Sequence, residues 1–175
     1  MDIVDNSYAT VASPTVTMGA VTFSFSYQTT TGILGSSDGD GEQIYVANPD
    51  GADSGWTIAI AANDVADLWD GSTSSFDFND PTGSGETNGQ MTIDASESVV
   101  TKGTCLSCTT GNVTKGGSTA FDQGVTDSAT LMTGEAASDD IGDWTLREVS
   151  VSQKIPAEKP AEAYAIQMVI TIAAI

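Results

Sequence analysis

The sequence predicts an all-β protein, a single antiparallel β-sandwich of immunoglobulin-like or jelly-roll-like type, with long loops and little or no helix. Three observations predict this class. Apolar and polar residues alternate at period two in several short runs, as they do on a half-buried strand. Clusters of Gly, Asn, Asp, Ser and Pro separate these runs. Lys, Arg and Leu are scarce while Thr, Ser and Gly are abundant, which disfavours a mainly helical chain.

The alternation is clearest in two runs of the first half of the chain. In residues 21–27 the apolar side chains take every second position: Val21, Phe23, Phe25 and Tyr27. Residues 56–62 alternate in the same way, beginning at Trp56. Shorter strands are expected at residues 43–47, 89–94 and 129–133. Long loops are expected at residues 29–42, 70–88 and 102–124.

Two stretches depart from plain alternation. In WTLREVSVSQ the apolar positions are in phase at Trp144 and Leu146 and then shift by one residue to Val149 and Val151, which predicts a β-bulge. The stretch ANDVADLWDG (62–71) has the one helical signal of the chain, a capping Asn or Asp followed by a closing glycine. A single helical turn and a loop with a 3₁₀ turn fit this stretch equally well.

Residues 163–175, AYAIQMVITIAAI, are the most apolar run. At period two one face holds the large side chains: Tyr164, Ile166, Met168, Ile170 and Ile172. The run is shorter than the roughly 20 residues of a membrane-spanning helix. We therefore expect no membrane span but the final strand of the sandwich, which is also a candidate assembly strand. Its partner strand lies either in the same chain or in a second copy.

The charge is strongly acidic, with 24 Asp and Glu against 5 Lys and Arg and a net charge of −19. Phosphate binding needs clustered Lys and Arg, so the charge argues strongly against nucleic acid as a partner and disfavours an anionic membrane surface. Divalent cations are the natural partners of such a surface. Solubility alone is the other explanation of the charge.

The length of 175 residues suits one domain, residues 1–175, of which 1–17 form a candidate N-terminal arm or donor strand. The first residues have neither the cationic nor the apolar region of a signal peptide. The chain is therefore either cytosolic or numbered from its mature start. The composition and the cysteines favour a secreted protein at the cell surface.

The chemistry of most enzymes is missing from the sequence. With no histidine, the usual Ser-His-Asp and Cys-His catalysts are absent, as are most transition-metal sites. Paired carboxylates are the remaining catalytic option, but 24 acidic residues make such pairs unspecific. We expect no enzyme. The pair Cys105 and Cys108 is expected to form a small disulfide that shapes a loop, with two free thiols as the alternative.

Acidic loops are the second feature with a chemical interpretation. Calcium takes six to eight oxygen ligands, which Asp, Asn and Gly loops supply. The candidate ligands lie in three clusters: Asp38, Asp40 and Glu42; Asp77, Asn79 and Asp80; Asp139, Asp140 and Asp143. None has the spacing of an EF-hand. Ordinary turn chemistry is the alternative explanation, because Asp and Asn favour turns in every β protein.

Two stretches, GADSGWTIAIAANDV (51–65) and IPAEKPAEAYAIQMVITI (155–172), resemble segments of secreted bacterial WxL-like β-sandwich surface proteins. The second also resembles the closing stretch of pilus-like sandwiches. A Trp-x-Leu triplet stands at residues 144–146. The resemblance implies a non-catalytic extracellular module with a structural or adhesive role.

Two functions follow as hypotheses. In the first, copies of the chain form an extracellular filament or surface layer, in which a strand of one copy completes a sheet of the next. The donor is either the arm 1–17 or the C-terminal strand, and calcium is a candidate stabilising ion. The second is a monomeric module that binds the cell wall or a cell-surface glycan, with Trp69 and Tyr45 as candidate contact residues.

Overall fold

The computed structural model describes residues 1–36, 41–48, 54–82, 87–136 and 142–175. Every regular element in these ranges is a β-strand, and all strand pairs are antiparallel. The strands are β1 (Asp2–Val4), β2 (Gln28–Leu34), β3 (Gln43–Asn48), β4 (Trp56–Ala62), β5 (Leu68–Asp70), β6 (Ser75–Asp77), β7 (Gln90–Asp94), β8 (Val99–Lys102), β9 (Val113–Lys115), β10 (Ser118–Ala120), β11 (Ser128–Gly134), β12 (Gly142–Arg147), β13 (Val149–Ile155) and β14 (Met168–Ala174). The predicted all-β class is confirmed.

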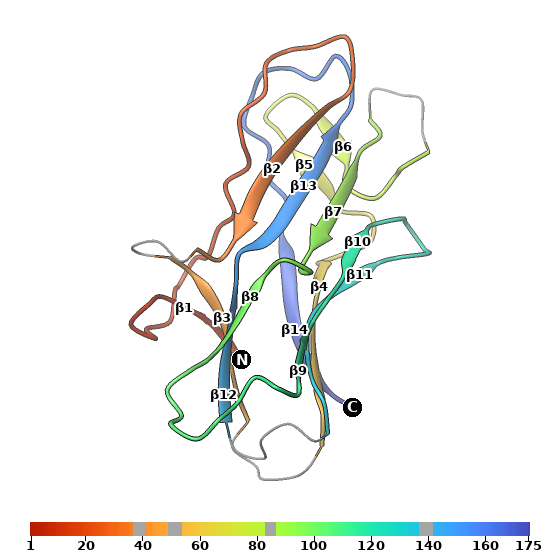
Figure 1. Ribbon diagram of the computed structural model, residues 1–175. Coiled ribbons are helices and arrows are strands. Elements are labelled where there is room, and N and C mark those ends of the chain that lie inside the picture. The colour runs from red at the N-terminus through yellow and green to blue at the C-terminus, as the bar shows by residue number, and fades with distance from the viewer. Residues whose placement is uncertain (37–40, 49–53, 83–86, 137–141) are drawn as a thin grey trace.

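Three four-stranded sheets build the two layers (Figure 1). Sheet A has the order β1-β3-β12-β8, sheet B the order β10-β7-β13-β2, and sheet C the order β14-β4-β11-β9. Sheets A and B follow one another along the long direction of the molecule and form one layer. Sheet C forms the other layer. A small hairpin of β5 and β6 stands beside sheet B.

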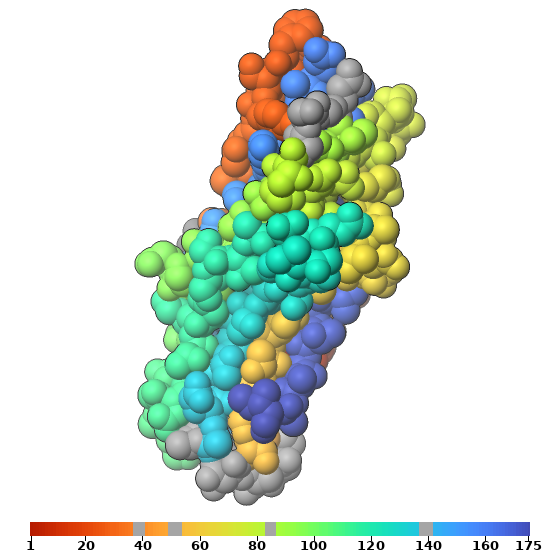
Figure 2. Space-filling view, turned by 90° about the vertical axis from the view of Figure 1, so that its right-hand side faces the viewer, coloured from red at the N-terminus to blue at the C-terminus, as the bar shows by residue number. Residues whose placement is uncertain are grey.

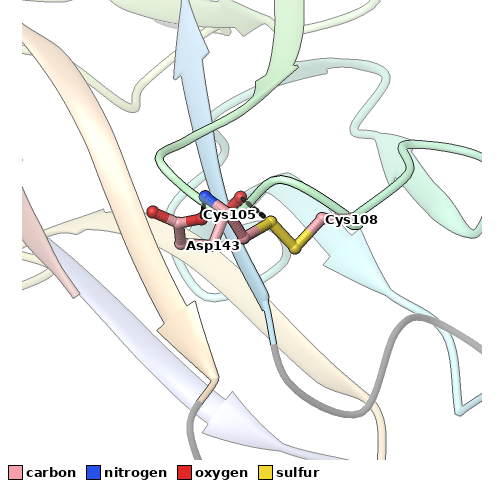
Figure 3. A group of neighbouring side chains, drawn as sticks. All are labelled: Cys105, Cys108 and Asp143. Atoms are coloured by element: carbon pink, nitrogen blue, oxygen red, sulfur yellow. Dashed lines mark hydrogen bonds between the residues drawn. A yellow bond between two sulfur atoms is a disulfide. The ribbon is translucent and has the colours of Figure 1, made fainter.

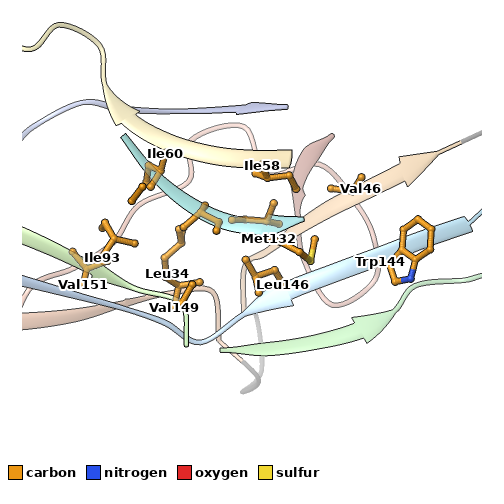
Figure 4. Close-up of a cluster of buried hydrophobic side chains, with 14 of the residues drawn as sticks. Leu34, Val46, Ile58, Ile60, Ile93, Met132, Trp144, Leu146, Val149 and Val151 are labelled. Carbon is orange, nitrogen blue, oxygen red and sulfur yellow. The ribbon is translucent and has the colours of Figure 1, made fainter. Parts of the chain in front are cut away.

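The core lies between sheet C and the composite layer of sheets A and B (Figure 4). Ile58 and Met132 from sheet C are fully buried against side chains such as Leu146 and Val149 from the other layer. Inward positions alternate with outward ones along β4, β7 and β13, as the period of a strand requires. Burial of these apolar side chains is the main force that holds the layers together.

The phase shift between Leu146 and Val149 falls at Glu148, where β12 of sheet A ends and β13 of sheet B begins, so the predicted bulge within one strand is instead a break between two strands. Glu148 has a positive φ of 63°, and its backbone N–H donates to the carbonyl of Gly35, whose φ is 79°. These two residues mark the point where the strands pass from sheet A to sheet B. A Cβ on Gly35 would lie 2.9 Å from the Arg147 Cα, so only glycine fits there. The shift keeps Leu146 and Val149 both buried in one core.

The expected strand at residues 21–27 is wrong. The structure gives these residues no strand conformation, and β2 begins only at Gln28. Phe23 and Phe25 are exposed and contact each other edge to face, with ring centroids 5.1 Å apart. The inward positions of β2 are instead Thr30, Gly32 and Leu34, whose polar and small side chains hid the strand in the sequence. Apolar and polar residues do alternate in residues 21–27, but within this chain the apolar side chains stay exposed.

The other expectations have mixed outcomes. β3, β4, β7 and β11 lie where strands were expected. The expected long loops are interrupted by strands: the seven-residue β2 in the first, and three-residue strands in the others, β6 in the second and β9 and β10 in the third. The stretch 62–71 forms a turn, in which the Asp67 N–H donates to the Asp64 carbonyl, and then enters β5. The side chains of Asp64 and Asp67 accept hydrogen bonds from backbone N–H groups within this turn, and no helix begins there.

Candidate functional site: the groove beside the C-terminal strand

The final strand β14 is an edge strand. Along its full length it pairs with β4, from Met168 opposite Ala62 to Ala174 opposite Trp56. In the part of the chain that the structure describes, its other edge has no strand partner. In Figure 2, β14 lies at the surface beside β4 and β11. The expected final strand is thus present, and it begins at Met168, after Tyr164 and Ile166.

The apolar face of β14 is incompletely covered. Met168 and Ile170 are half-buried against the core, as are Tyr164 and Ile166 in the preceding segment, whereas Ile172 is exposed. None of these five side chains is fully buried. The sandwich is therefore open along the side where β14 ends sheet C.

Two adjoining cavities form a groove along this open side, here called the lateral groove. The lower cavity, of about 550 Å³, is lined by β14, by core residues of both layers such as Ile60 and Met91, and by residues of the N-terminal arm such as Ile3, Val11 and Pro14. The upper cavity, of about 690 Å³, lies between residues 16–24, the hairpin β5–β6 and residues 159–164. Val16, Met18, Trp69 and Tyr164 line both cavities. The two cavities thus form one groove, with a lower part that reaches the core and is lined mostly by apolar residues and an upper part that has more polar lining residues.

Residues 16–19 give the groove a partial cover on the side of sheet B. The Gly19 N–H donates to the Thr31 carbonyl of edge strand β2 at 2.8 Å, and the Thr30 hydroxyl donates to the Gly19 carbonyl. Val16 and Met18 are half-buried over Gly32, where a Cβ would lie 2.8 Å from the Met18 sulfur. These residues cross β2 without forming a regular strand.

A carboxylate clasp holds the segment that leads into β14. Glu162 accepts hydrogen bonds from the backbone N–H groups of Ser72, Thr73 and Ser74 and from the hydroxyls of Ser72 and Thr73. The bond from the Ser72 hydroxyl and the backbone bonds that follow keep the pKa of Glu162 below its ordinary value. Lys159 adds a bond to the Ser75 carbonyl at 2.8 Å. The clasp fixes one wall of the upper cavity.

Of the first acidic cluster only Glu42 lies within the described residues, whereas the second cluster is described in full. Asp38 and Asp40 lie outside the described residues, and the Glu42 carboxylate accepts a bond from the Thr15 N–H at 3.2 Å. Asn79 is buried, and its amide donates to the Val65 carbonyl at 2.8 Å. Asp77 is half-buried, and burial, with the charge of Asp80 second, raises the pKa of its carboxyl group. The charge of Asp80 thus disfavours the charged form of Asp77, and a bound cation would offset this effect.

The third cluster is represented by Asp143 alone, because Asp139 and Asp140 lie outside the described residues. Asp143 is buried on β12, beside Cys105 and Cys108 (Figure 3). The potential ligand atoms of these three residues lie within 4.8 Å of one another, the one such group of three found in the described ranges. The two cysteines form a disulfide with their Cα atoms 5.7 Å apart, so neither sulfur is a thiolate ligand.

The carboxylate of Asp143 organises the loop of the disulfide. It accepts bonds from the Cys105 N–H at 2.8 Å, from the N–H and hydroxyl of Thr104 at 2.7 and 2.8 Å, and from the Tyr45 hydroxyl at 2.9 Å. Burial alone would raise the pKa of Asp143, but these bonds outweigh it and hold that pKa below its ordinary value. The arrangement is a structural anchor that ties the disulfide loop to β12 and β3.

The aromatic candidates for glycan contact are engaged within the chain. Trp69 stacks on Phe76 with ring centroids 6.2 Å apart, and its indole N–H donates to Gln153 at 2.8 Å. The Tyr45 hydroxyl is bonded to Asp143. Trp144 and Leu146, the tryptophan and the leucine of the Trp-x-Leu triplet, are fully buried in the core. Trp69 is nonetheless part of the groove lining, a position that sequence reasoning did not identify.

The distribution of charge along the sequence is a further signal for the groove. Residues 6–37 and residues 163–175 contain no charged side chain, although the chain as a whole carries a net charge of −19. In the structure parts of both uncharged runs line the lateral groove. The absence of charge in both runs is thus the property of the sequence that relates these two distant segments to one site.

Comparison of the chain with protein-family models, with curated proteins and with solved structures found no match. The resemblance to WxL-like and pilus-like proteins therefore rests on the quoted segments alone. The described residues include no helix long and apolar enough to cross a membrane.

Proposed function

We propose that this protein is a structural subunit of an extracellular filament or surface layer, in which copies join by adding a strand of one chain to a sheet of the next. The observation that carries the proposal is the open side of the sandwich. There the unpaired edge of β14 and the mostly apolar lower part of the lateral groove lie together. The proposal assigns the protein no catalytic activity.

The groove supports strand addition because it offers both parts of such a contact. A free edge supplies backbone hydrogen-bond groups for a new strand, and the mostly apolar lower part of the groove supplies a place for every second side chain of that strand. Exposed edges usually lead to unwanted pairing, and proteins commonly cover or charge them. Residues 163–175 carry no charge, so this edge is not protected in that way.

The alternative, a monomeric module that binds the cell wall or a glycan, has less support. Such modules present exposed aromatic rings, whereas Trp69 stacks on Phe76 and Tyr45 is bonded to Asp143. The exposed aromatic side chains of residues 21–27 are Phe23, Phe25 and Tyr27, and they follow the alternation of a strand. This pattern favours contact with another β-sheet.

We propose calcium as a stabilising ion of the assembled form, because the high negative charge opposes contact between copies and because the charge of Asp80 disfavours the charged form of Asp77. A ligand that binds only the native state must raise its melting temperature. Thermal unfolding with calcium and with EDTA checks this, at matched ionic strength and with magnesium as the control. Equal melting temperatures in calcium and in EDTA would contradict the proposed binding of calcium.

The assembly itself is tested by size-exclusion chromatography with light scattering and by negative-stain microscopy. Purified protein at micromolar concentration, with calcium present, is expected to form polymers of regular width. A chain that stays monomeric under these conditions at all ionic strengths would contradict the proposed function.

A further inference from the structure

We infer that residues 21–27 of one copy form the strand that adds to the free edge of β14 in the next copy. The inference rests on the proposed assembly and names the contact that creates it. We call residues 21–27 the aromatic segment. It differs from the arm 1–17 and from the C-terminal strand, the two donors that the sequence suggested.

The aromatic segment has the side-chain pattern of a half-buried strand but lacks a sheet to cover it. Its apolar side chains stand at odd positions and its Thr and Ser residues at even positions. Phe23 is 51% exposed and Phe25 is 78% exposed, while the described part of the chain gives the segment no strand pairing. Exposed aromatic residues in strand alternation indicate a contact with another molecule.

The segment fits the free edge of β14 in length and in chemistry. β14 is seven residues long, as is the range 21–27, and a strand of that length spans roughly 23 Å. Added beside β14, the segment would direct one face into the lateral groove and the other to solvent. The odd-numbered side chains would meet groove residues such as Ile60 and Ile170, and Thr22, Ser24 and Ser26 would face water.

The backbone of β14 presents its hydrogen-bond groups to such a strand at known positions. The Ile175 N–H donates to the Gly55 carbonyl, and the Asn63 N–H donates to the Gln167 carbonyl. In an antiparallel pair, residues that bond the partner alternate with residues that face away. Met168, Ile170, Ile172 and Ala174 therefore direct their N–H and C=O groups to the open side.

The distribution of charge also favours contact between the aromatic segment and β14. Two copies that each carry a net charge of −19 repel each other, so close contact is least costly where neither surface is charged. The aromatic segment lies within the uncharged run 6–37, and β14 lies within the uncharged run from residue 163 onward. No other uncharged stretch of the sequence is as long as these two.

The aromatic segment makes few contacts of its own. The residues before it are held by buried Val4, by half-buried Val16 and Met18, and by the Thr15–Glu42 and Gln43–Asp5 hydrogen bonds, all of which strand donation would break. The Glu158 N–H donates to the Ser24 carbonyl at 2.7 Å, and the Gly19 N–H donates to the Thr31 carbonyl at 2.8 Å. Before them, β1 pairs only three residues with β3. Tyr27 is fixed beside Lys154, whose ammonium lies 4.2 Å from the ring centroid. Residues 1–26 would swing out about this point, and β2 would stay in sheet B.

A pair of double variants with equal charge tests the inference. Phe23→Glu with Phe25→Glu places two carboxylates on the face that enters the groove. Thr22→Glu with Ser26→Glu places the same charge on the face that stays in water. Polymer is measured by light scattering and negative-stain microscopy, and the monomer fold by thermal unfolding. We expect the first variant to lose polymer by at least about tenfold, because a carboxylate is not tolerated in an apolar groove. The second is expected to assemble as the wild type does.

The outcomes separate the inference from the proposed function. Polymers in the Phe23 and Phe25 variant, or loss of polymers in both variants, would overturn the inference while the wild-type polymer still supports assembly. A wild-type chain that never polymerises would overturn the proposed function itself. If the first variant does not fold, Phe23→Ala with Phe25→Ala decides the question in the same way, since both side chains are exposed in the monomer.

Discussion

Ile58 and Ile172 lie directly opposite each other in the β4–β14 pair and on the same face of sheet C, yet Ile58 is 0% exposed and Ile172 is 42% exposed. Two neighbouring positions of one sheet thus have opposite environments. The opposing layer covers β4 fully and β14 only in part, since Met168 and Ile170 are half-buried while Ile172 is exposed. The lateral groove is the space that results.

The first prediction compares these two isoleucines. Ile58→Ala removes a fully buried side chain, and we expect it to destabilise the monomer by about 2–5 kcal/mol. Ile172→Ala removes an exposed one, and we expect a loss below about 1 kcal/mol for the monomer together with a clear loss of polymer. Urea unfolding at low protein concentration measures the first quantity, and light scattering measures the second. Equal destabilisation of the monomer by both changes would show that Ile172 is covered within its own chain.

The second prediction uses proline to block one edge of β14. Proline removes an N–H donor and is tolerated in an edge strand where that N–H faces solvent. Ile172→Pro removes an N–H that we assign to the free edge, so the variant is expected to fold and not to assemble. Thr171→Pro removes an N–H that we assign to the pair with β4 and is expected to destabilise the monomer itself. Circular dichroism and light scattering distinguish the two effects. Assembly of the Ile172→Pro variant at wild-type level would place the contact elsewhere.

The third prediction separates the aromatic segment from the arm 1–17. Removal of residues 1–20 keeps the aromatic segment but takes away the three-residue pairing of β1 with β3 and the cover that Val16 and Met18 give the groove. Polymers are expected to persist, because the aromatic segment and β14 both remain. Removal of residues 1–27 takes the segment away and is expected to leave a folded monomer. Size-exclusion chromatography of both truncated chains measures this. Loss of polymers after the shorter truncation, with the monomer still folded, would favour the arm 1–17 as the donor.

The fourth prediction concerns pH. The folded state holds the pKa of Asp143 below its ordinary value of 3.8, so the unfolded chain binds a proton first as the pH falls. The stabilisation from this carboxylate is therefore fully present above pH 3.8 and is lost as the pH falls through the lower, folded-state pKa. Asp143→Asn removes this contribution, and the difference in unfolding free energy between wild type and variant should shrink toward acidic pH. Unfolding curves between pH 2 and 7 check it. A difference that is constant over this range would contradict the role of Asp143 as a charged anchor.

Two strands, β4 and β2, show what alternation in the sequence can and cannot predict. β4 was predicted with its observed bounds because Trp56, Ile58 and Ile60 alternate with smaller residues. β2 was missed because Thr30 and Gly32 take inward positions, and the aromatic run before it was interpreted as the strand instead. Alternation shows that a segment suits a sheet, but it does not say whether that sheet belongs to the same chain.

The candidate sites were predictable to a smaller extent. The sequence suggested Asp143 as a calcium ligand and not as the anchor of the disulfide loop, because its partners Thr104 and Tyr45 are 39 and 98 residues away and no spacing pattern joins them. The groove depends on where sheet C ends relative to the opposite layer. That relationship is set by the stacking of sheets and cannot be found in any single run of residues. The two uncharged runs are the part of it that the sequence contains.

Photo-crosslinking within assembled protein tests the central claim most directly. A benzophenone side chain replaces Phe25, and the variant is assembled with an excess of isotope-labelled wild-type chain before irradiation. Mass spectrometry then identifies the crosslinked residues and the copy to which they belong. The account predicts crosslinks from position 25 to residues 166–174 of the labelled copy. Crosslinks confined to the same copy, or to a region of the labelled copy away from β14, would contradict it.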